Sequence, residues 1–322
     1  MLNKIKVLLC ALFLGTAVSA AMAQMYPDRP IKVIQGFPAG GNADTIARVV
    51  TTEVSKNLGQ PFVVEAVTGA GGSIGSAAVA RAKPDGYTLL LATGGHVVAG
   101  AVYKELGYKT VDDFEMISTV TYFPFLWAVR ADSPYKSLAD LLSAAKTKPN
   151  SIAYGTAGVG STHHLAGELL AKLSKTMLLH VPYRGDAKSI PALLGGEVPL
   201  VVAPPTAVMG HVKAGKLRVL AVTGPQRWAE MPDVPTVAEQ GVEGYDARSW
   251  AGFMAPAGTP RPIVDRLNLE IKKTLQDKTV SDRLRDMGGD VKGSTPEEMK
   301  TMVASELQRW SALVNEANIP KH

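Results

Sequence analysis

Cysteine is almost absent from this sequence, and so are long hydrophobic runs. The single cysteine among the 322 residues is Cys10. A chain cleaved after Cys10 therefore has no disulfide, no thiolate nucleophile and no cysteine metal site. Beyond residue 24, no stretch is continuously apolar over the roughly 18 residues that a membrane-spanning helix needs. These absences exclude cysteine chemistry and predict that the rest of the chain does not insert into a membrane.

The first residues have the pattern of a secretory signal peptide. Lys4 and Lys6 supply the positive start, and the apolar run 7–18 is too short to span a membrane. The motif Ala21-Met22-Ala23 then has the small side chains that precede a cleavage site. We expect residues 1–23 to be removed near Ala23 and the mature protein to be periplasmic.

Charge is nearly balanced in the mature chain. Without Lys4 and Lys6, 32 basic side chains stand against 29 acidic ones, a net charge of +3. The basic residues are spread along the chain, and they form no cluster with aromatic residues of the kind that binds nucleic acid. We therefore expect these charges to be solvated surface groups and expect no nucleic-acid partner.

Strand-like and helix-like segments alternate along the chain, as they do in α/β folds. The runs Ile31–Phe37 and Tyr87–Thr93 are predicted strands, and Asp44–Leu58 is a predicted helix with one apolar face. Almost wholly apolar strands such as Tyr87–Thr93 suit parallel sheets that are buried on both faces. A second series of the same kind runs from Ile152 to Thr223. We expect two lobes, each a mostly parallel sheet flanked by helices.

Two segments are predicted to pass between the lobes. The aromatic run Ile117–Val129 interrupts the alternation, and Arg248–Ala255 has the pattern of a returning strand. The chain is also longer than the size at which single hydrophobic cores stop growing. We expect residues 24–124 and 248–322 to form lobe one and residues 125–247 to form lobe two, with the two crossing strands as the hinge.

Three glycine-rich turns each lie between a predicted strand and a predicted helix: Phe37–Arg48, Thr68–Ala80 and Tyr154–Glu168. Each turn can present free backbone N–H groups beside the positive end of a helix dipole, which is a favourable place for an anion. A tight connection without any ligand is the alternative for a single turn. Three such turns, distributed over both lobes, favour a shared anionic ligand.

Other chemistries lack the residues that they require. GAGGSIG nearly matches a dinucleotide fingerprint, but the next strand ends in Thr93-Gly94-Gly95, with no acidic residue for a ribose. His163 and His164, with Glu168 after them, could suggest a metal site. A histidine in the first turn of a helix that faces solvent or the cleft explains them without a metal. Residues 71–75, GGSIG, match G-x-S-x-G in spacing, but we assign no Asp and His that would complete a hydrolase triad with Ser73. We expect no catalytic residues, no metal and no cofactor.

Six motifs occur in order along the chain: YPDRPIKVIQGFPAGGNADTIAR, TGAGGSIGSAAVARAKPDGYTLLLAT, YGTAGVGSTHHLAGELL, VPYRGDAKSIPALLGGEV, KAGKLRVLAVTGPQR and PDVPTVAEQG. At these residues the chain resembles the periplasmic solute receptors of the tripartite tricarboxylate transporters, often called Bug receptors. The resemblance covers essentially the whole mature chain. It implies a two-lobed, type II-like periplasmic binding fold and delivery of a small carboxylate to a membrane permease.

The resemblance also implies where the ligand binds. Residues 37–44 and 69–73 of lobe one would grip one carboxylate, largely through backbone groups and ordered water, and the loop 156–163 would close on it from lobe two. Converging neutral donors can hold an anion without a buried cation. The complete set of expected substrate-binding residues is Phe37, Pro38, Ala39, Gly40, Gly41, Asn42, Asp44, Gly71, Gly72, Ser73, Gly94, His96, Thr156, Ala157, Gly158, Gly160, Thr162, His163, Arg184, Gly185 and Pro204.

One departure from the family bears on the ligand. Family members often carry an aspartate after the GGEV region, where this chain has PLVVAPPTAV with Pro199, Pro204 and Pro205. The missing acid weakens the case for an amino acid and leaves dicarboxylates, tricarboxylates and aromatic carboxylates open. We expect a monomer whose partners are membrane permease subunits. A receptor that presents its closed form to a membrane sensor kinase is the alternative.

Overall fold

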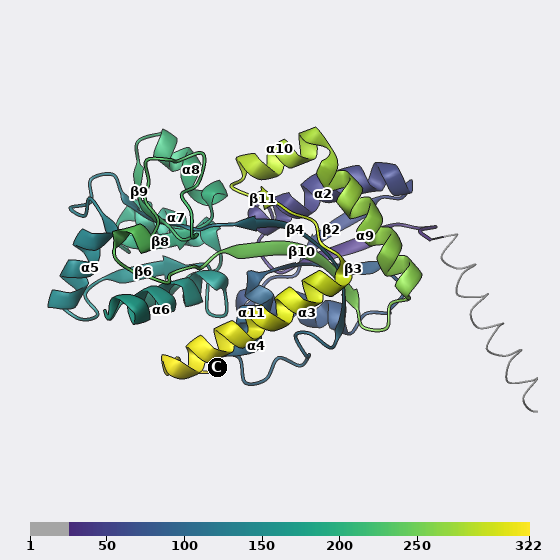
Figure 1. The fold of residues 1–322 in the computed structure, drawn as a ribbon, viewed down its shortest axis with the longest axis horizontal. Coiled ribbons are helices and arrows are strands. Elements are labelled where there is room, and N and C mark those ends of the chain that lie inside the picture. The colour runs from purple at the N-terminus through teal and green to yellow at the C-terminus, as the bar shows by residue number, and fades with distance from the viewer. Residues whose placement is uncertain (1–25) are drawn as a thin grey trace, which may run out of the picture.

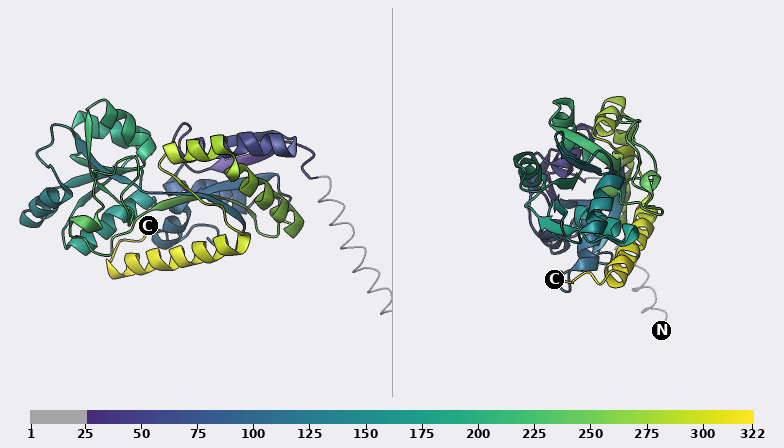
Figure 2. Two further views of the ribbon diagram at one scale, coloured as in Figure 1. Left: turned by 45° about the horizontal axis from the view of Figure 1, so that its top comes forward. Right: turned by 90° about the vertical axis from the view of Figure 1, so that its left-hand side faces the viewer.

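The computed structural model describes residues 26–322, so the expected signal peptide, residues 1–23, lies outside the described residues. In the described part, two β-sheets lie side by side and helices flank both of them (Figure 1). The left-hand view of Figure 2 shows that the two sheet-and-helix units remain distinct when the molecule is turned. The α/β, two-lobed architecture that the sequence predicts is therefore confirmed.

The first sheet has the strand order β11-β4-β10-β3-β1-β2. Its strands are β1 (Ile31–Gln35), β2 (Phe62–Ala66), β3 (Thr88–Thr93), β4 (Phe114–Phe123), β10 (Ser249–Pro256) and β11 (Asp290–Val291). β1 pairs in parallel with β2 and β3, whereas β10 runs antiparallel to β3 and β4, and β11 runs antiparallel to β4. This sheet is therefore mixed.

The second sheet has the order β7-β6-β8-β5-β9. Its strands are β5 (Leu126–Arg130), β6 (Ala153–Thr156), β7 (Leu179–Pro182), β8 (Leu200–Ala203) and β9 (Leu217–Val222). β6 pairs in parallel with β7 and β8, but β5 runs antiparallel to β8 and β9. Most strands of both sheets share one direction, as expected. The pairs around β5 and β10 depart from it because these strands arrive from the other unit and run against their neighbours.

Helices cover both faces of the first sheet. The helices of this unit are α2 (Asn42–Leu58), α3 (Ser73–Ala80), α4 (Gly94–Val102), α9 (Arg261–Gln276), α10 (Lys278–Asp286) and α11 (Pro296–Glu316), with the 3-10 turn η1 (Ala70–Gly72) before α3. α2 packs with α9 and α10 on one face, and α4 packs with α11 on the other (Figure 1). The predicted apolar face of α2 is buried, including Ile46 and Val50. Helical periodicity thus identifies the side that meets the core.

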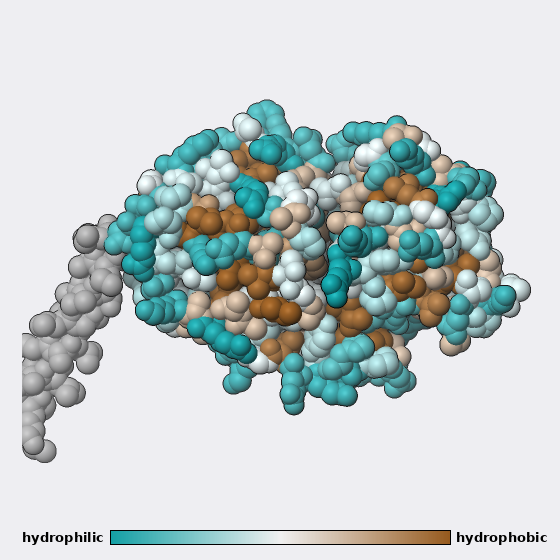
Figure 3. All heavy atoms as spheres, turned by 180° about the vertical axis from the view of Figure 1, so that it is seen from behind, coloured by the Kyte–Doolittle hydropathy of each residue, from teal (hydrophilic) through white to brown (hydrophobic). Residues whose placement is uncertain are grey.

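The second unit has four helices among the described residues. They are α5 (Leu138–Thr147), α6 (Thr162–Ser174), α7 (Asp186–Gly195) and α8 (Pro205–Lys213), and a 3-10 turn, η2 (Ala238–Gln240), follows β9. Trp127 on β5 is fully buried and its ring meets that of Tyr154 at 6.0 Å between centroids. On the face of the molecule shown in Figure 3, hydrophilic residues cover much of both units, and smaller hydrophobic patches lie among these residues.

The first crossing between the units is not the single strand that the run Ile117–Val129 predicts. β4 ends at Phe123 and β5 begins at Leu126, and the two strands belong to different sheets. Pro124 lies between them. Because proline has no N–H to donate to a ladder, it ends the pairing of β4 and lets the chain turn into the second sheet. The crossing lies where the sequence predicts it, but it consists of two strands separated by Pro124 instead of one continuous strand.

Thr223 forms hydrogen bonds with both segments that connect the units, at Phe125 in the first crossing and at Ala247 before the returning strand β10. Its backbone exchanges two hydrogen bonds: the Thr223 N–H donates to Phe125 O, and the Ala247 N–H donates to Thr223 O, both at 3.0 Å. The Thr223 hydroxyl accepts from the Phe125 N–H at 2.7 Å and donates to Ala247 O at 3.0 Å. Thr223 is fully buried, so water does not compete for these bonds. One side chain therefore joins both connections between the units.

We predict that Thr223→Val lowers the free energy of unfolding by about 2 kcal/mol or more, because it leaves the Phe125 N–H and one Ala247 acceptor site unpaired in the interior. Urea denaturation followed by circular dichroism measures this change. Thr301→Val on the exposed surface of α11 removes a similar hydroxyl and serves as the control. Equal stability of the two variants would show that the Thr223 bonds contribute little.

Candidate functional site

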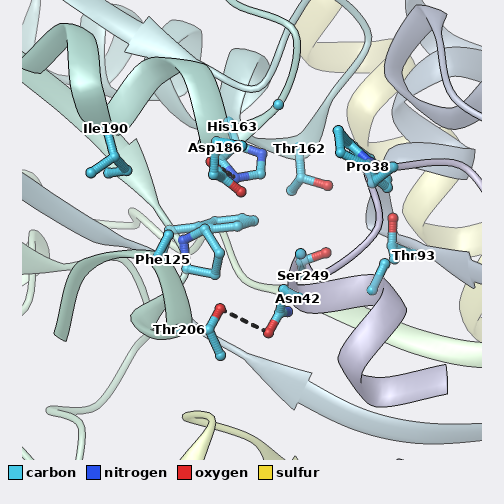
Figure 4. Close-up of a pocket in the computed structure, with 18 of the residues that line it drawn as sticks. Pro38, Asn42, Thr93, Phe125, Thr162, His163, Asp186, Ile190, Thr206 and Ser249 are labelled. Atoms are coloured by element: carbon cyan, nitrogen blue, oxygen red, sulfur yellow. Dashed lines mark hydrogen bonds and ion pairs between the residues drawn. The ribbon is translucent and has the colours of Figure 1, made fainter. Parts of the chain in front are cut away.

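A cavity of about 380 Å³ opens between the two units. Its volume lies in the range of small-molecule binding sites. The residues around it, ten of which are labelled in Figure 4, come from loops and helix starts of both units. They are Phe37, Pro38, Ala39, Gly40, Gly41, Asn42, Ala43, Thr93, Phe123, Phe125, Thr162, His163, Gly185, Asp186, Ala187, Ile190, Pro191, Pro204, Thr206, Ala207, His211 and Ser249.

Helix N-termini dominate the cavity wall. The first turns of α2, α6, α7 and α8 all contribute lining residues, and Thr93 is the N-cap of α4. The N-caps of α2, α7 and α8 are Gly41, Gly185 and Pro204, and none of them provides a side-chain cap. The Lys188 and Ala207 N–H groups bond to Gly185 O and Pro204 O, and Pro205 has no N–H. The remaining first-turn N–H groups have no partner within their own helix and are available to a bound molecule.

Neither lysine nor arginine is among the residues of 26–322 that form the cavity wall. Its ionisable side chains are His163, Asp186 and His211. An anion bound here would be stabilised by backbone dipoles and neutral donors instead of by a cationic side chain. Phe37, Phe123 and Phe125 add apolar surface on the remaining walls. The arrangement suits a small molecule with a negative group and an apolar body.

Ten of the residues predicted from the sequence line this cavity. The loop before α2 contributes six in a row, which are Phe37, Pro38, Ala39, Gly40, Gly41 and Asn42. The second unit contributes Thr162, His163, Gly185 and Pro204. The structure therefore brings together the first and third glycine-rich turns, which are far apart in sequence. Their contact with a ligand remains a prediction.

The second glycine-rich turn lies behind the cavity wall. Gly71 and Gly72 belong to η1 and, with His96, border a separate small void, and Ser73 begins α3. A Cβ atom on Gly71 would lie 2.4 Å from the carbonyl carbon of Gly160 in the other unit. Because only glycine permits this approach, we infer that Gly71 and Gly160 provide a contact between the units.

Asp44 and His96 are occupied by their own neighbours. The Asp44 carboxylate accepts hydrogen bonds from the Gly40 N–H and from Arg48. Burial is the largest single influence and raises the Asp44 pKa, but the hydrogen bonds from Arg48 and the Gly40 N–H and the charge of Arg48 together outweigh it, so the pKa lies below its usual value. The His96 ring bonds to Ser76 and to the Thr110 carbonyl, and burial lowers its pKa to about 4. Both side chains support the fold around the cavity.

The other predicted residues lie near the cavity without lining it. The Gly94 N–H donates to Ser249 Oγ at 3.2 Å, and Ser249 itself is in the wall. The Thr156 hydroxyl bonds to His180, and the Gly158 N–H donates to Thr156. The residues outside the wall are Asp44, Gly71, Gly72, Ser73, Gly94, His96, Thr156, Ala157, Gly158, Gly160 and the exposed Arg184.

Sequence reasoning missed the contributions of α7 and α8. Within the second predicted series, the sequence pattern predicts helices at about 190–194 and 207–213, whereas α7 begins at Asp186 and α8 at Pro205. Pro191 lies within α7 and obscured its helical pattern. Starting the helices too late hid the wall residues Asp186, Ala187 and Thr206. The signal that was available is Gly185 followed by an acidic residue, which is typical of a helix start.

Contacts also cross the cavity mouth. The Thr206 hydroxyl on α8 donates to Asn42 Oδ1 on α2 at 3.1 Å, as the dashed line in Figure 4 shows. Gly185 approaches Pro38 so closely that a Cβ atom on it would lie 3.0 Å from the proline ring. The loops of the two units therefore meet around the cavity.

His163 and Asp186 face each other on the wall that belongs to the second unit (Figure 4). His163 Nε2 lies 3.4 Å from Asp186 Oδ1, and neither atom has a hydrogen-bond partner. Burial raises the pKa of the Asp186 carboxyl to about 7 and lowers the pKa of the His163 imidazole to about 3. Near neutral pH, His163 is therefore uncharged and Asp186 is partly ionised, so His163 does not compensate the negative charge of the ionised Asp186.

Residues 26–322 hold neither a cluster of metal ligands nor a helix suited to cross a membrane. This part of the chain contains no group of three or more His, Cys, Asp or Glu side chains arranged to hold a metal ion. His164 Nε2 lies 3.9 Å from Glu168 Oε1, and the His164 ring stacks on the ring of His180. None of the helices in this range combines the length and the apolar character that crossing a membrane requires.

Comparisons with known proteins agree on one family. The family described as "Tripartite tricarboxylate transporter family receptor" matches residues 46–319. The periplasmic binding protein BugD is 35% identical with a TM-score of 0.87, over 92% of this chain and 100% of that one. Rpa4515 of R. palustris, solved with adipate, is 34% identical with a TM-score of 0.87, over 92% and 99%. MatC of Rhodopseudomonas palustris, solved with bound malate, is 33% identical with a TM-score of 0.84, over 90% and 100%.

We predict that Asp186→Asn stabilises the protein above neutral pH in the absence of ligand. The folded pKa of Asp186, about 7, exceeds the unfolded value near 3.8. Its contribution to stability is therefore complete below about pH 4 and is lost as the pH rises through 7. The asparagine variant avoids this loss, so its advantage grows from pH 4 to 8 and reaches about 1 to 4 kcal/mol.

Denaturant titrations at pH 4.5, 6 and 8 measure this difference. The His163 pKa is depressed, so its contribution is lost as the pH falls toward 3, but it is present in both proteins and cancels to first order. Asp265→Asn, which changes an exposed carboxylate on α9, should show no such pH trend. A variant that is less stable than the parent at pH 8 would contradict the assignment of an uncompensated charge.

Proposed function

Because the chain belongs to the tripartite tricarboxylate transporter receptor family and is a periplasmic solute-binding receptor, not an enzyme, we propose that it delivers a small carboxylate to the membrane permease subunits of such a transporter. The carboxylate binds in the cavity between the two units. One observation carries this proposal: uncapped helix starts from both units converge on a cavity whose wall contains no lysine or arginine. Such a cavity favours an anion through backbone N–H groups.

The carboxylate occupies the loop before α2. Residues 37–41 lead into the N-terminus of a 17-residue helix, so the positive end of its dipole faces the cavity. Gly40 has a φ of +78°, and a Cβ atom there would meet nothing within 4 Å, so glycine serves the turn and leaves space beside the backbone. Two relatives, solved with adipate and with malate, bind carboxylates of the same general class. That similarity supports the proposed ligand class.

Binding is coupled to closure of two lobes. Lobe one comprises residues 24–124 and 248–322, lobe two comprises residues 125–247, and the hinge lies at the crossings that Thr223 joins. A ligand held from both sides contacts its complete site only when the lobes are together, so it stabilises the closed form. Contacts such as Asn42 to Thr206 hold the same arrangement. The mature protein acts as a periplasmic monomer after removal of residues 1–23.

The carboxylate site is tested by Gly41→Asp. This change places a negative side chain at the N-cap of α2, where it competes with the ligand for the same N–H groups. We expect carboxylate affinity to fall at least a hundredfold, whereas the matched Gly41→Asn variant should lose tenfold or less. A thermal-shift panel of mono-, di- and tricarboxylates identifies the ligand, and calorimetry then measures affinity. The proposal fails if no carboxylate binds or if both variants lose affinity equally.

Closure is tested by Gly71→Ala. Its Cβ atom would collide with the Gly160 backbone across the gap, so we expect affinity to fall at least tenfold. Gly215→Ala is the matched control, because Gly215 has a similar φ of +67° against +64° for Gly71 but no neighbour within 4 Å of a Cβ atom. Calorimetry gives the affinities, and small-angle scattering gives the radius of gyration with ligand. Equal losses in both variants would attribute the effect to backbone strain alone.

A further inference from the structure

The His163–Asp186 pair is the most unusual feature of the cavity wall. The His163 side chain is 9% exposed and the Asp186 side chain 21% exposed. Both ring nitrogens of His163 and Asp186 Oδ1 are buried without a hydrogen-bond partner. Buried polar atoms are almost always paired in folded proteins. Three unpaired polar atoms on one side of a cavity therefore indicate partners that come from a bound molecule.

The surroundings offer this pair no other partner. The His163 ring packs against Phe125 at 4.3 Å between centroids, and Ile190, Pro191 and Pro204 supply apolar surface to the same cavity. Ser189, one turn along α7, is fully buried, and its hydroxyl is also unpaired. Among the described residues, neither lysine nor arginine lines the cavity. The Asp186 carboxylate thus faces the cavity without a counter-charge from the described residues around it.

We propose that Asp186 and His163 form a specificity-determining site that binds a hydrogen-bond donor, either a hydroxyl or an ammonium group, at the end of the ligand remote from its carboxylate. This inference rests on the proposed function and narrows its ligand class. The cargo is a monocarboxylate with a distal donor, and a second carboxylate is disfavoured. Such a ligand would place its donor on Asp186 Oδ1 and use the neutral His163 ring as a second partner.

Charge and donor inventory lead to this choice. Asp186 is partly ionised near pH 7, and in that form its carboxylate only accepts hydrogen bonds, so it needs a donor. Burial keeps His163 neutral, because its pKa is about 3, so one ring nitrogen accepts while the other donates. A second ligand carboxylate beside Asp186 would put like charges together in a poorly solvated place. An ammonium would supply the missing counter-charge, and a hydroxyl would satisfy the acceptor without it.

This site changes the expectation drawn from the sequence. The proline-rich stretch 199–205 lacks the acidic residue that family members often carry, which weakened the case for an amino-acid ligand. Asp186 supplies an acidic group from a different element, the start of α7. Zwitterionic and hydroxylated carboxylates therefore return as candidates. The absence of an acidic residue at the family's usual position therefore does not exclude an amino-acid ligand for this chain.

Matched probes on three scaffolds test the proposal. The four-carbon series is butyrate, 4-hydroxybutyrate, 4-aminobutyrate and succinate. The six-carbon series is hexanoate, 6-hydroxyhexanoate, 6-aminohexanoate and adipate. The aromatic series is benzoate, 4-hydroxybenzoate, 4-(aminomethyl)benzoate and terephthalate. With the mature protein at pH 7.5, calorimetry should show that the hydroxyl or amino member of the best scaffold binds at least tenfold more tightly than its plain acid and its diacid.

Two variants separate recognition from folding. Asp186→Asn should lower the affinity for the amino probe at least thirtyfold, change the hydroxyl probe less, and raise the affinity for the diacid. His163→Phe keeps the ring packing on Phe125 and removes both nitrogens, so it should weaken the hydroxyl and amino probes alike. Asp265→Asn on the exposed face of α9 should leave the ranking unchanged.

The outcomes distinguish this inference from the proposed function. If the parent protein prefers diacids, or if Asp186→Asn leaves the ranking of the probes unaltered, the donor site is wrong and carboxylate binding stands. If no carboxylate of any scaffold binds, both the donor site and the carboxylate function are wrong. A preference for donors that disappears in both pocket variants and persists in the α9 control establishes the site.

Discussion

Backbone N–H groups at helix starts are the interaction on which the binding site depends. α2, α7 and α8 begin at the cavity without side-chain caps, so their first-turn donors face the space between the units. Each helix alone is an ordinary feature. Their convergence gives a positive potential that needs no lysine or arginine, and it avoids the desolvation cost of burying a cation. A receptor that must also release its cargo benefits from this weaker form of attraction.

That convergence requires two rigid units held at a defined hinge. The mixed sheets provide the rigidity, because β5 and β10 are bonded on both sides within their sheets. The hinge is narrow: Thr223 meets both Phe125 and Ala247 through backbone and hydroxyl bonds. Glycines at the facing surfaces, such as Gly71 and Gly160, let the backbones approach. Hinge and glycine contacts together explain how loops distant in sequence share one cavity.

The unpaired pair His163–Asp186 marks where the fold leaves something for a ligand to complete. A protein interior normally pairs its polar atoms, and the sites that depart from this rule are commonly functional. Asp186 is also the first residue of α7, where the helix dipole offsets part of the cost of burying its negative charge. Position and function therefore agree, since the residue that begins the helix also faces the cavity.

Much of this molecule was accessible from its amino-acid order. Local rules predicted the strands around Ile31–Gln35 and Thr88–Thr93, the amphipathic helix α2 and the crossing near Pro124, since hydrophobic period and proline act over short distances. Six motifs indicated the family. Tertiary structure alone decided that Gly71 meets Gly160 and that His96 turns inward to Ser76. It also decided that Asp186 faces His163, because these contacts join segments whose separation in sequence carries no local signal.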